Sequence, residues 1–393
     1  RGSAPPMGIG DLDAPLAPLS VVGRLDRLRK QFDEAGPEGR AVDALLVTTP
    51  ANVRWLTGFS GSAGRLLVTT GRAWLTTDGR YRTQAAEQLD AAGVADVIEV
   101  VVGNARTQRE AVVTGAVSVG AHRIGLEADR VTWADARDWE RAFERGQLEP
   151  TRGVVEALRA VKDAGEVARM ERAAAIADAA LSDLLPRLSE LAGGGGDLTE
   201  SVFAADLDHA MRRRGAEESA FETIVASGEN SAKPHARPGP RPIRRGDPVV
   251  IDFGATYDGY RSDMTRTVFV GEPSDGELAD VWAVVFESQR AGVDAVAPGV
   301  SAAAVDETCR GRIAEAGWAD RFEHGTGHGV GLDIHEAPAV GPGSTAILQV
   351  GTVVTVEPGV YLPGRGGVRI EDTLVVTEHG SRPFTRFPKE VAV

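Results

Sequence analysis

The sequence predicts two domains, a mixed α/β domain over residues 1–153 and an α+β domain with an internal pseudo-twofold repeat over residues 154–393. Three observations support this prediction. The chain has 393 residues, more than one ordinary hydrophobic core holds. Short apolar strands alternate with short helices as far as Pro150, as in α/β domains. From Val154 onwards, long helices bracket strand hairpins in two successive rounds.

In the first domain, apolar runs and turn residues predict two helices, five strands and one turn-rich segment. The helices are expected at 25–32 and 84–89, the strands at 44–48, 65–70, 73–77, 97–102 and 124–126, and the turns at 52–64.

The second domain begins with a helix start signal. Asp163, followed three residues later by Glu166, predicts a capping box and a helix that runs to about Leu191. The other elements follow from periodicity: helices at 197–214, 276–296 and 302–316, and strands at 223–226, 248–253, 261–270, 352–357 and 368–376.

Composition excludes several classes of function. The net charge is −14 and no dense Lys/Arg run is present, so we expect neither nucleic acid nor membranes as partners. No apolar run approaches the roughly 20 residues that span a bilayer. Cys309 is the only cysteine, which rules out an intrachain disulfide and thiolate metal cages, and indicates a cytoplasmic setting.

A glycine-rich loop contains three of the seven histidines within twelve positions. It reads His324-Gly-Thr-Gly-His328-Gly-Val-Gly-Leu-Asp-Ile-His335. Glycine lacks side-chain bulk, so other groups can approach the imidazoles closely. The density of histidine and glycine indicates a functional site.

Two aspartates flank a predicted hairpin. Asp258-Gly259 is a strong signal for a two-residue turn. This turn pairs Tyr257 with Tyr260, Asp252 with Thr265 and Asp263 with Gly254. Asp252 and Asp263 then share one face as diagonal neighbours, roughly 7–8 Å apart, and can reach one ion. Solvent-facing aspartates and a buried salt bridge are the alternatives, but a carboxylate in so apolar a strand favours metal binding.

Two glutamates repeat this pattern, because Glu357 ends one apolar strand and Glu371 lies in the next. Four carboxylates at one site would repel each other strongly, and two divalent cations would neutralise them. With His328, the set has five ligands, mostly oxygen. Such a set favours Mn²⁺, with Co²⁺, Fe²⁺ or Zn²⁺ as alternatives, and paired ions of this kind support hydrolysis.

On these residues, the chain resembles the proline-specific metallopeptidase family of aminopeptidase P and prolidase, whose catalytic domain has the pita-bread fold. Asp252 and Asp263 fit its paired aspartates, His328 its loop histidine, and Glu357 and Glu371 its two glutamates. Three further segments also match the family: 221–235, which ends in its substrate-facing histidine, and 56–64 and 77–81, which resemble its N-terminal domain.

The resemblance implies roles for further residues. Glu357 would also act as general base, and His235 and His335 would orient the scissile peptide and stabilise the tetrahedral intermediate. Phe221, His324 and Arg369 would wall the pocket for the proline ring. Phe221 stands where some members have tyrosine, so a hydroxyl contact would be absent. His235 could instead be simply exposed, and Arg369 could be an ordinary ion-pair partner.

The resemblance also implies a function and partners. The main hypothesis is an aminopeptidase that removes the first residue from peptides with proline second. The nearest alternative is a dipeptidase restricted to Xaa-Pro. A metal-independent creatinase-like hydrolase and a non-catalytic peptide-binding module are disfavoured because all five ligands are present. The expected partners are proline-containing peptides and a second copy of the chain, in a homodimer where 52–64 is the candidate contact.

Overall fold

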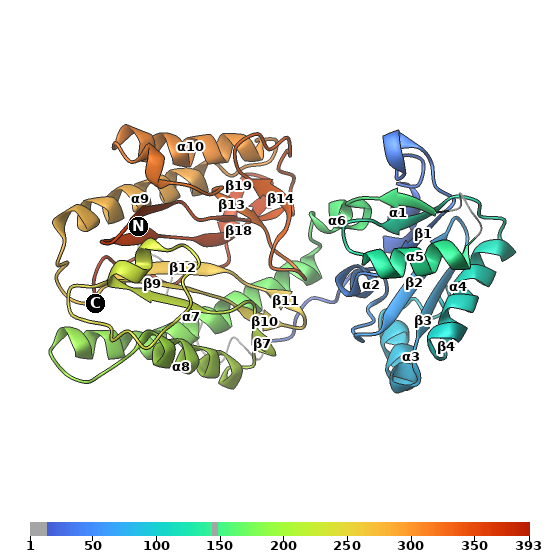
Figure 1. Cartoon of the computed structure of the whole chain (residues 1–393), viewed down its shortest axis with the longest axis horizontal. Coiled ribbons are helices and arrows are strands. Elements are labelled where there is room, and N and C mark those ends of the chain that lie inside the picture. The colour runs from blue at the N-terminus through green and yellow to red at the C-terminus, as the bar shows by residue number, and fades with distance from the viewer. Residues whose placement is uncertain (1–13, 144–147) are drawn as a thin grey trace. The chain divides into compact units, whose positions relative to one another are not determined.

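The computed structural model describes residues 14–143 and 148–393 (Figure 1). The chain divides into two compact units, one of residues 18–159 and one that joins residues 14–17 to 160–393. The first unit ends with helix α6 (Val154–Arg159), whereas the sequence pattern placed the boundary after residue 153. No helix among the described residues is long and apolar enough to cross a membrane.

The N-terminal unit is built on one six-stranded mixed sheet with strand order β4-β3-β2-β1-β5-β6. Its strands are β1 (Ala44–Val47), β2 (Gly64–Thr69), β3 (Ala73–Thr77), β4 (Glu99–Val102), β5 (Ile124–Glu127) and β6 (Leu148–Thr151). The pairs β1–β2 and β2–β3 are antiparallel, and the other three pairs are parallel. Besides α6, its helices are α1 (Arg24–Arg29), α2 (Pro50–Thr57), α3 (Arg82–Ala91), α4 (Ala105–Ser118) and α5 (Trp133–Ala142).

Helix α2 shows that the predicted turn-rich segment 52–64 is wrong over its first part, because residues 52–57 are helical. Pro50 lies in its first turn, where a missing N–H does no harm, and Gly58 ends it with φ 78°. Trp55 and Leu56 are buried on its inner side. Proline and glycine therefore mark the two ends of a short helix here. Helices α4 and α5 and the edge strand β6, which contains Pro150, were also not predicted.

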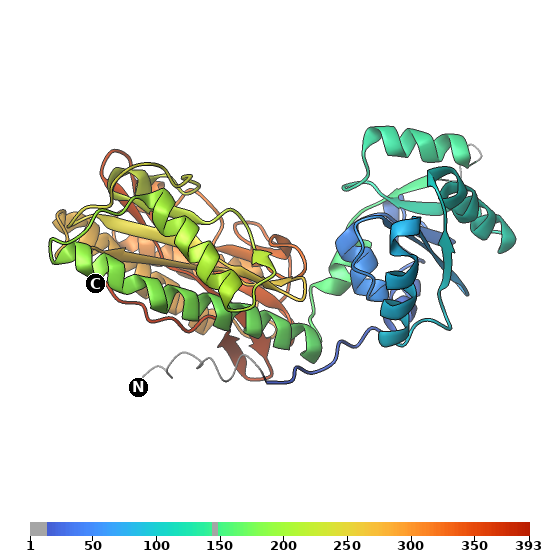
Figure 2. The ribbon, with the colours of Figure 1, turned by 90° about the horizontal axis from the view of Figure 1, so that it is seen from below.

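The C-terminal unit has four long helices close to their predicted positions, α7 (Ala164–Ala192), α8 (Glu200–Arg213), α9 (Gly276–Ala295) and α10 (Ala302–Glu315). The capping box is present as predicted, since Asp163 accepts from the Glu166 N–H while Glu166 reaches back to the Asp163 N–H. Helix α8 starts later than expected, after its N-cap Thr199. In Figures 1 and 2 the pair α7 and α8 and the pair α9 and α10 lie on opposite sides of the strands.

The strands of this unit also form two successive groups. The first comprises β7 (Glu218–Ser219), β8 (Ile224–Ser227), β9 (Pro248–Phe253), β10 (Ala255–Tyr257), β11 (Tyr260–Arg261) and β12 (Met264–Phe269). The second comprises β13 (Gly327–Gly329), β14 (Glu336–Val340), β15 (Val353–Val356), β16 (Gly359–Leu362), β17 (Gly366–Arg369), β18 (Asp372–Thr377) and β19 (Gly380–Pro383). One buried core joins α7 and α8 to the first group, and another joins α9 and α10 to the second. This repetition matches the predicted pseudo-twofold architecture.

The aspartate hairpin has the predicted register. Tyr257 pairs with Tyr260 and Asp252 with Thr265, around a turn in which Asp258 has φ 44° and Gly259 φ 69°. The ladder is interrupted between β9 and β10. A Cβ at Gly254 would lie 1.9 Å from the Ser262 carbonyl oxygen, so the two strands approach more closely than any side chain would allow.

The glutamate hairpin is interrupted in the same way. Val356 pairs with Asp372 before the break, and Gly359 pairs with Arg369 after it. The same register sets Glu357 opposite Glu371, between the paired segments. Pro358 follows Glu357 and has no N–H to donate, which explains why the ladder stops there. In both hairpins the acids therefore lie at or beside the bend.

Candidate metal centre and active site

One cavity of about 550 Å³ in the C-terminal unit contains every site residue that the sequence analysis named. Its walls come from both bent hairpins, from the glycine-rich loop and from the segment after β7. The named residues that line it are Phe221, His235, Asp252, Asp263, His324, His328, His335, Glu357, Arg369 and Glu371.

Three of the four carboxylates are close enough to share an ion. Asp252, Asp263 and Glu371 each offer one oxygen, and these atoms lie within 4.8 Å of one another. Burial, followed by the charges of neighbouring carboxylates, raises the pKa of Asp263 and of Glu371 well above their usual values. The Oδ1 atom of Asp252 is buried and has no hydrogen-bond partner among the described residues. A cation would neutralise the excess of negative charge at this cluster and would satisfy the unpaired oxygen.

His328 completes this group with a correctly oriented ring. Its Nδ1 lies 2.9 Å from the Gly329 carbonyl oxygen, so Nδ1 carries the proton and donates it. The lone pair is then on Nε2, which lies 3.4 Å from Glu357 Oε1 and 3.6 Å from Asp263 Oδ2. Burial lowers the pKa of His328, which favours the neutral imidazole that metals require. Hydrogen bonding of Nδ1 to a carbonyl is the usual support for a metal-binding histidine.

Glu357 lies between His328 and the other acids. Thr355 Oγ1 donates to Glu357 Oε1 at 3.0 Å, and the same hydroxyl accepts from the His328 N–H at 3.0 Å. Burial raises the pKa of Glu357 to about 7, against the opposing effect of Arg369. One threonine thus orients both a carboxylate and the backbone of the loop histidine.

Arg369 connects the acids to the other side of the cavity. Its guanidinium contacts Asp252 Oδ2 at 2.7 Å, so the ion-pair alternative holds for this residue, and it also donates to Tyr361 Oη at 2.9 Å. The ring of His324 donates from Nδ1 to the Gly325 carbonyl oxygen and accepts from Tyr361 Oη at 2.9 Å. Burial lowers the pKa of His324 to about 4, so this ring is neutral. A continuous hydrogen-bonded wall therefore runs from Asp252 to His324.

The glycines of the loop allow neighbouring backbone segments to pack closely against it. A Cβ at Gly327 would lie 2.1 Å from the Thr355 carbonyl oxygen, and one at Gly329 would lie 2.2 Å from that of Ala337. Glycine is required because strand β13 is inserted between β14 and β15. The groups that approach the loop are therefore backbone carbonyls as well as side chains.

The remaining residues lie on the open side of the cavity. His235 is exposed and lines the cavity, and its role toward a substrate stays a prediction. The ring of His335 stands edge-on to His328, with centroids 4.4 Å apart. Phe221 is half-buried in the wall. Accessible imidazoles next to buried acids are suited to contact a peptide that enters from solvent.

Sequence reasoning missed three hydroxyl groups that organise the site. Thr355 orients Glu357 and the His328 backbone, Tyr361 joins Arg369 to His324, and Thr265 Oγ1 donates to Glu371 Oε2 at 2.7 Å. The spacing offered one signal: Tyr361 is an even number of residues from Glu357, so both are expected on one face of an extended segment. Thr265 had been predicted opposite Asp252, but nothing in the sequence assigned it a partner.

Four carboxylates at the bends of two hairpins and one imidazole from the glycine-rich loop form a donor set that suits two divalent cations, and this is a site of the metallohydrolase class. Comparison with known proteins agrees. The family described as Metallopeptidase family M24 matches residues 168–378, and the Creatinase/Prolidase N-terminal domain matches residues 24–161. The chain belongs to metallopeptidase family M24, among its proline peptidases, and its C-terminal unit has the pita-bread fold.

Similar proteins cover nearly the whole chain. It is 40% identical over 370 residues to the uncharacterized peptidase YqhT of Bacillus subtilis, over 94% of this chain and 99% of that protein. The solved Xaa-Pro dipeptidase from Bacillus anthracis is 38% identical, with a TM-score of 0.87 over 95% of this chain and 100% of that one. The X-Pro aminopeptidase from Thermotoga maritima is 34% identical, with a TM-score of 0.79 over 90% and 98%.

Proposed function

We propose that this chain is a metal-dependent Xaa-Pro aminopeptidase, which removes the N-terminal residue from peptides with proline in second position. The observation that most supports the proposal is the single cavity that gathers five potential ligands together with accessible histidines and an arginine. The family supplies the general reaction, hydrolysis of peptides that contain proline.

Five side chains would hold two divalent ions: Asp252, Asp263, His328, Glu357 and Glu371. The donors are four carboxylates and one imidazole, which favours Mn²⁺ over the alternatives Co²⁺, Fe²⁺ and Zn²⁺. Bound ions would lower the pKa of the attacking water and polarise the scissile carbonyl.

The chain's own residues supply the remaining steps. Glu357, held at one oxygen by Thr355, accepts the proton of the attacking water as general base and returns it to the proline nitrogen as the scissile C–N bond breaks. His235 and His335 lie on the open side, where ring N–H groups can donate to the carbonyl oxygen as negative charge develops on it. Phe221, His324 and Arg369 shape the wall against which the proline ring would pack.

An Xaa-Pro dipeptidase is the second candidate, favoured by the similarity to the Bacillus anthracis dipeptidase. The two functions differ in substrate length, so product analysis on Xaa-Pro, Xaa-Pro-Yaa and longer peptides with defined Mn²⁺ separates them. We expect cleavage of the first bond in peptides of three residues or more, and no cleavage of matched Xaa-Ala-Yaa peptides. Hydrolysis of the dipeptide alone would replace the aminopeptidase with the dipeptidase. Tight binding of every peptide without hydrolysis would instead indicate a binding module.

We further propose that the chain acts in the cytoplasm as a homodimer. The single buried cysteine agrees with a reducing compartment, and the dimer follows from family resemblance. Static light scattering of the active protein should give twice the mass of 41.3 kDa calculated for one chain. A fully active species at the mass of one chain would exclude the dimer.

A further inference from the structure

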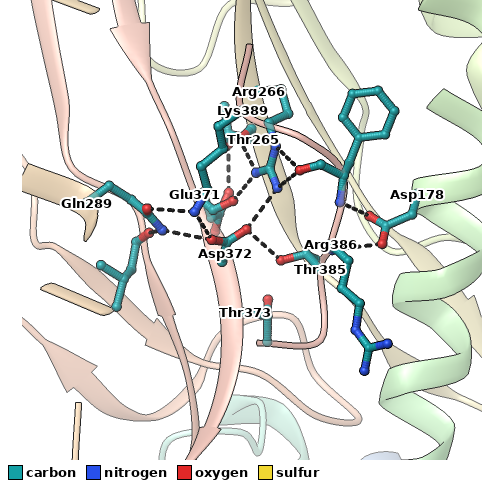
Figure 3. Close-up of polar contacts among 12 residues, drawn as sticks. Asp178, Thr265, Arg266, Gln289, Glu371, Asp372, Thr373, Thr385, Arg386 and Lys389 are labelled. Atoms are coloured by element: carbon teal, nitrogen blue, oxygen red, sulfur yellow. Dashed lines mark hydrogen bonds and ion pairs between the residues drawn. The ribbon is translucent and has the colours of Figure 1, made fainter. Parts of the chain in front are cut away.

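A buried polar network joins the C-terminal segment 384–389 to Glu371 and to Asp372, the first residue of β18 (Figure 3). The network lies behind the cavity, and neither the proposed catalytic steps nor the ligand set uses it. Its charged members are Asp178, Arg266, Asp372 and Lys389. All but Lys389 are almost fully buried.

Two acids hold the C-terminal segment. Asp178, on α7, accepts hydrogen bonds from the backbone N–H groups of Arg386 at 2.8 Å and Phe387 at 3.2 Å. Asp372 accepts from Thr385 Oγ1 at 2.9 Å and forms an ion pair with Lys389. The segment is thus held through the backbone N–H groups of two consecutive residues and through the side chains of Thr385 and Lys389.

Arg266 connects this segment to the candidate metal site. Its Nε and one terminal nitrogen donate to the Phe387 carbonyl oxygen at 3.0 and 2.7 Å. The same terminal nitrogen contacts Asp372 Oδ1 at 2.9 Å. The other terminal nitrogen donates to the carbonyl oxygens of Thr265 at 2.9 Å and Glu371 at 2.5 Å. These five bonds match the five N–H groups of a guanidinium, so its position is fully determined.

The two carbonyls on the far side of Arg266 belong to Thr265 and Glu371, and of these two residues Glu371 lines the cavity. Thr265 Oγ1 donates to Glu371 Oε2 at 2.7 Å, and the Glu371 N–H donates to the Thr265 carbonyl oxygen at 3.1 Å. Arg266 therefore holds, from behind, the backbone of one candidate ligand and of the threonine that orients its carboxylate.

We propose that residues 384–389 are a positioning element of the metal site, which acts through Arg266 on the Glu371 carboxylate. The inference rests on the proposed metal ligands. If the segment separated, Arg266 would lose both bonds to Phe387 and Asp372 would lose Thr385 and Lys389. Buried charges left without partners are strongly unfavourable, so the Thr265–Glu371 pair would shift to compensate.

The Asp178→Asn variant tests the proposed effect of residues 384–389 on the metal site, at a residue outside the cavity. An amide in place of the carboxylate puts an NH₂ group against a backbone N–H, which loosens the segment without touching a ligand. We expect the dissociation constant for Mn²⁺, measured by titration calorimetry on folded protein, to rise by about tenfold, as for other outer residues of metal sites. The Mn²⁺ concentration that half-activates peptide hydrolysis should rise in parallel, while kcat and KM at saturating Mn²⁺ return to their wild-type values.

Asp183→Asn is the matched control. It lies on the same helix, is 53% exposed and pairs with Arg214 away from the network. Its Mn²⁺ affinity should equal that of the wild type. Thr385→Val removes one hydrogen bond to Asp372 and should also weaken Mn²⁺ binding. This variant tests the proposal if Asp178→Asn does not fold.

Unchanged Mn²⁺ affinity in the folded variants would overturn the proposal, as would a lower kcat that saturating Mn²⁺ does not restore. Failure of the proposed function looks different. In that case the wild-type chain itself would bind no Mn²⁺, or would bind it normally and hydrolyse no proline peptide.

Discussion

Glu357→Gln should retain the fold and lose nearly all turnover. The amide keeps the shape of the side chain but can neither accept the proton of the attacking water nor contribute its negative charge to a pair of cations. Loss of a general base typically lowers the rate about 10²- to 10⁴-fold, and loss of a ligand adds to this. The measurement is kcat for an Xaa-Pro-Yaa peptide at saturating Mn²⁺.

Glu378→Gln, at an exposed site just after β18, is the control and should have the wild-type kcat. The thermal stability of Glu357→Gln without metal should be equal or higher, because the change removes one of several mutually repelling buried acids. A variant with near-normal kcat would exclude Glu357 from the role of base.

Chelation should abolish hydrolysis, and Mn²⁺ should restore it. Without cations, Asp252, Asp263 and Glu371 present oxygens within 4.8 Å of one another, and nothing in the cavity can activate water as strongly as a divalent ion. Dialysis against a chelator, an activity assay, and stepwise addition of Mn²⁺, Co²⁺, Zn²⁺ or Fe²⁺ would measure both the loss and the metal preference. Full hydrolysis by rigorously metal-free protein would refute the mechanism.

The metal-free protein should also lose stability as the pH rises. Burial raises the pKa of Glu357 from 4.5 to about 7, and those of Asp263 and Glu371 also lie above their ordinary values. An acid with a raised pKa in the folded state favours folding below its unfolded pKa, and this contribution is lost as the pH rises through the folded value. The melting temperature should therefore fall as the pH rises from about 4.5 to 7, and it should continue to fall above pH 7. Bound Mn²⁺ should largely remove this pH dependence of the melting temperature.

The parts of the site that the sequence predicted were those governed by local rules. A two-residue Asp-Gly turn fixes strand register, so the diagonal relation of Asp252 and Asp263 could be worked out and matches the observed pairing. The capping box at Asp163 and the helix pair before the histidine loop follow from equally local signals.

The parts that could not be predicted depend on contacts between distant segments. The bond from Arg369 to Asp252 joins residues 117 positions apart, and that from Arg266 to the Phe387 carbonyl joins residues 121 apart. Periodicity and turn chemistry contain no information on such pairs. Helix α2 was missed for another reason, since Pro50 and Gly58 are turn formers as well as helix ends.

The bent hairpins also restrict how the length of this chain can change. Side chains alternate between two faces of a strand, so one residue added to the Asp258–Gly259 turn would rotate Asp263 away from Asp252 and out of the cavity. The same holds for the loop between β16 and β17, which keeps Glu357 opposite Glu371. Insertions and deletions can be accommodated in a linker such as 193–196, but not inside either hairpin. The length of each hairpin loop is therefore as important for the metal site as the identity of the four acids.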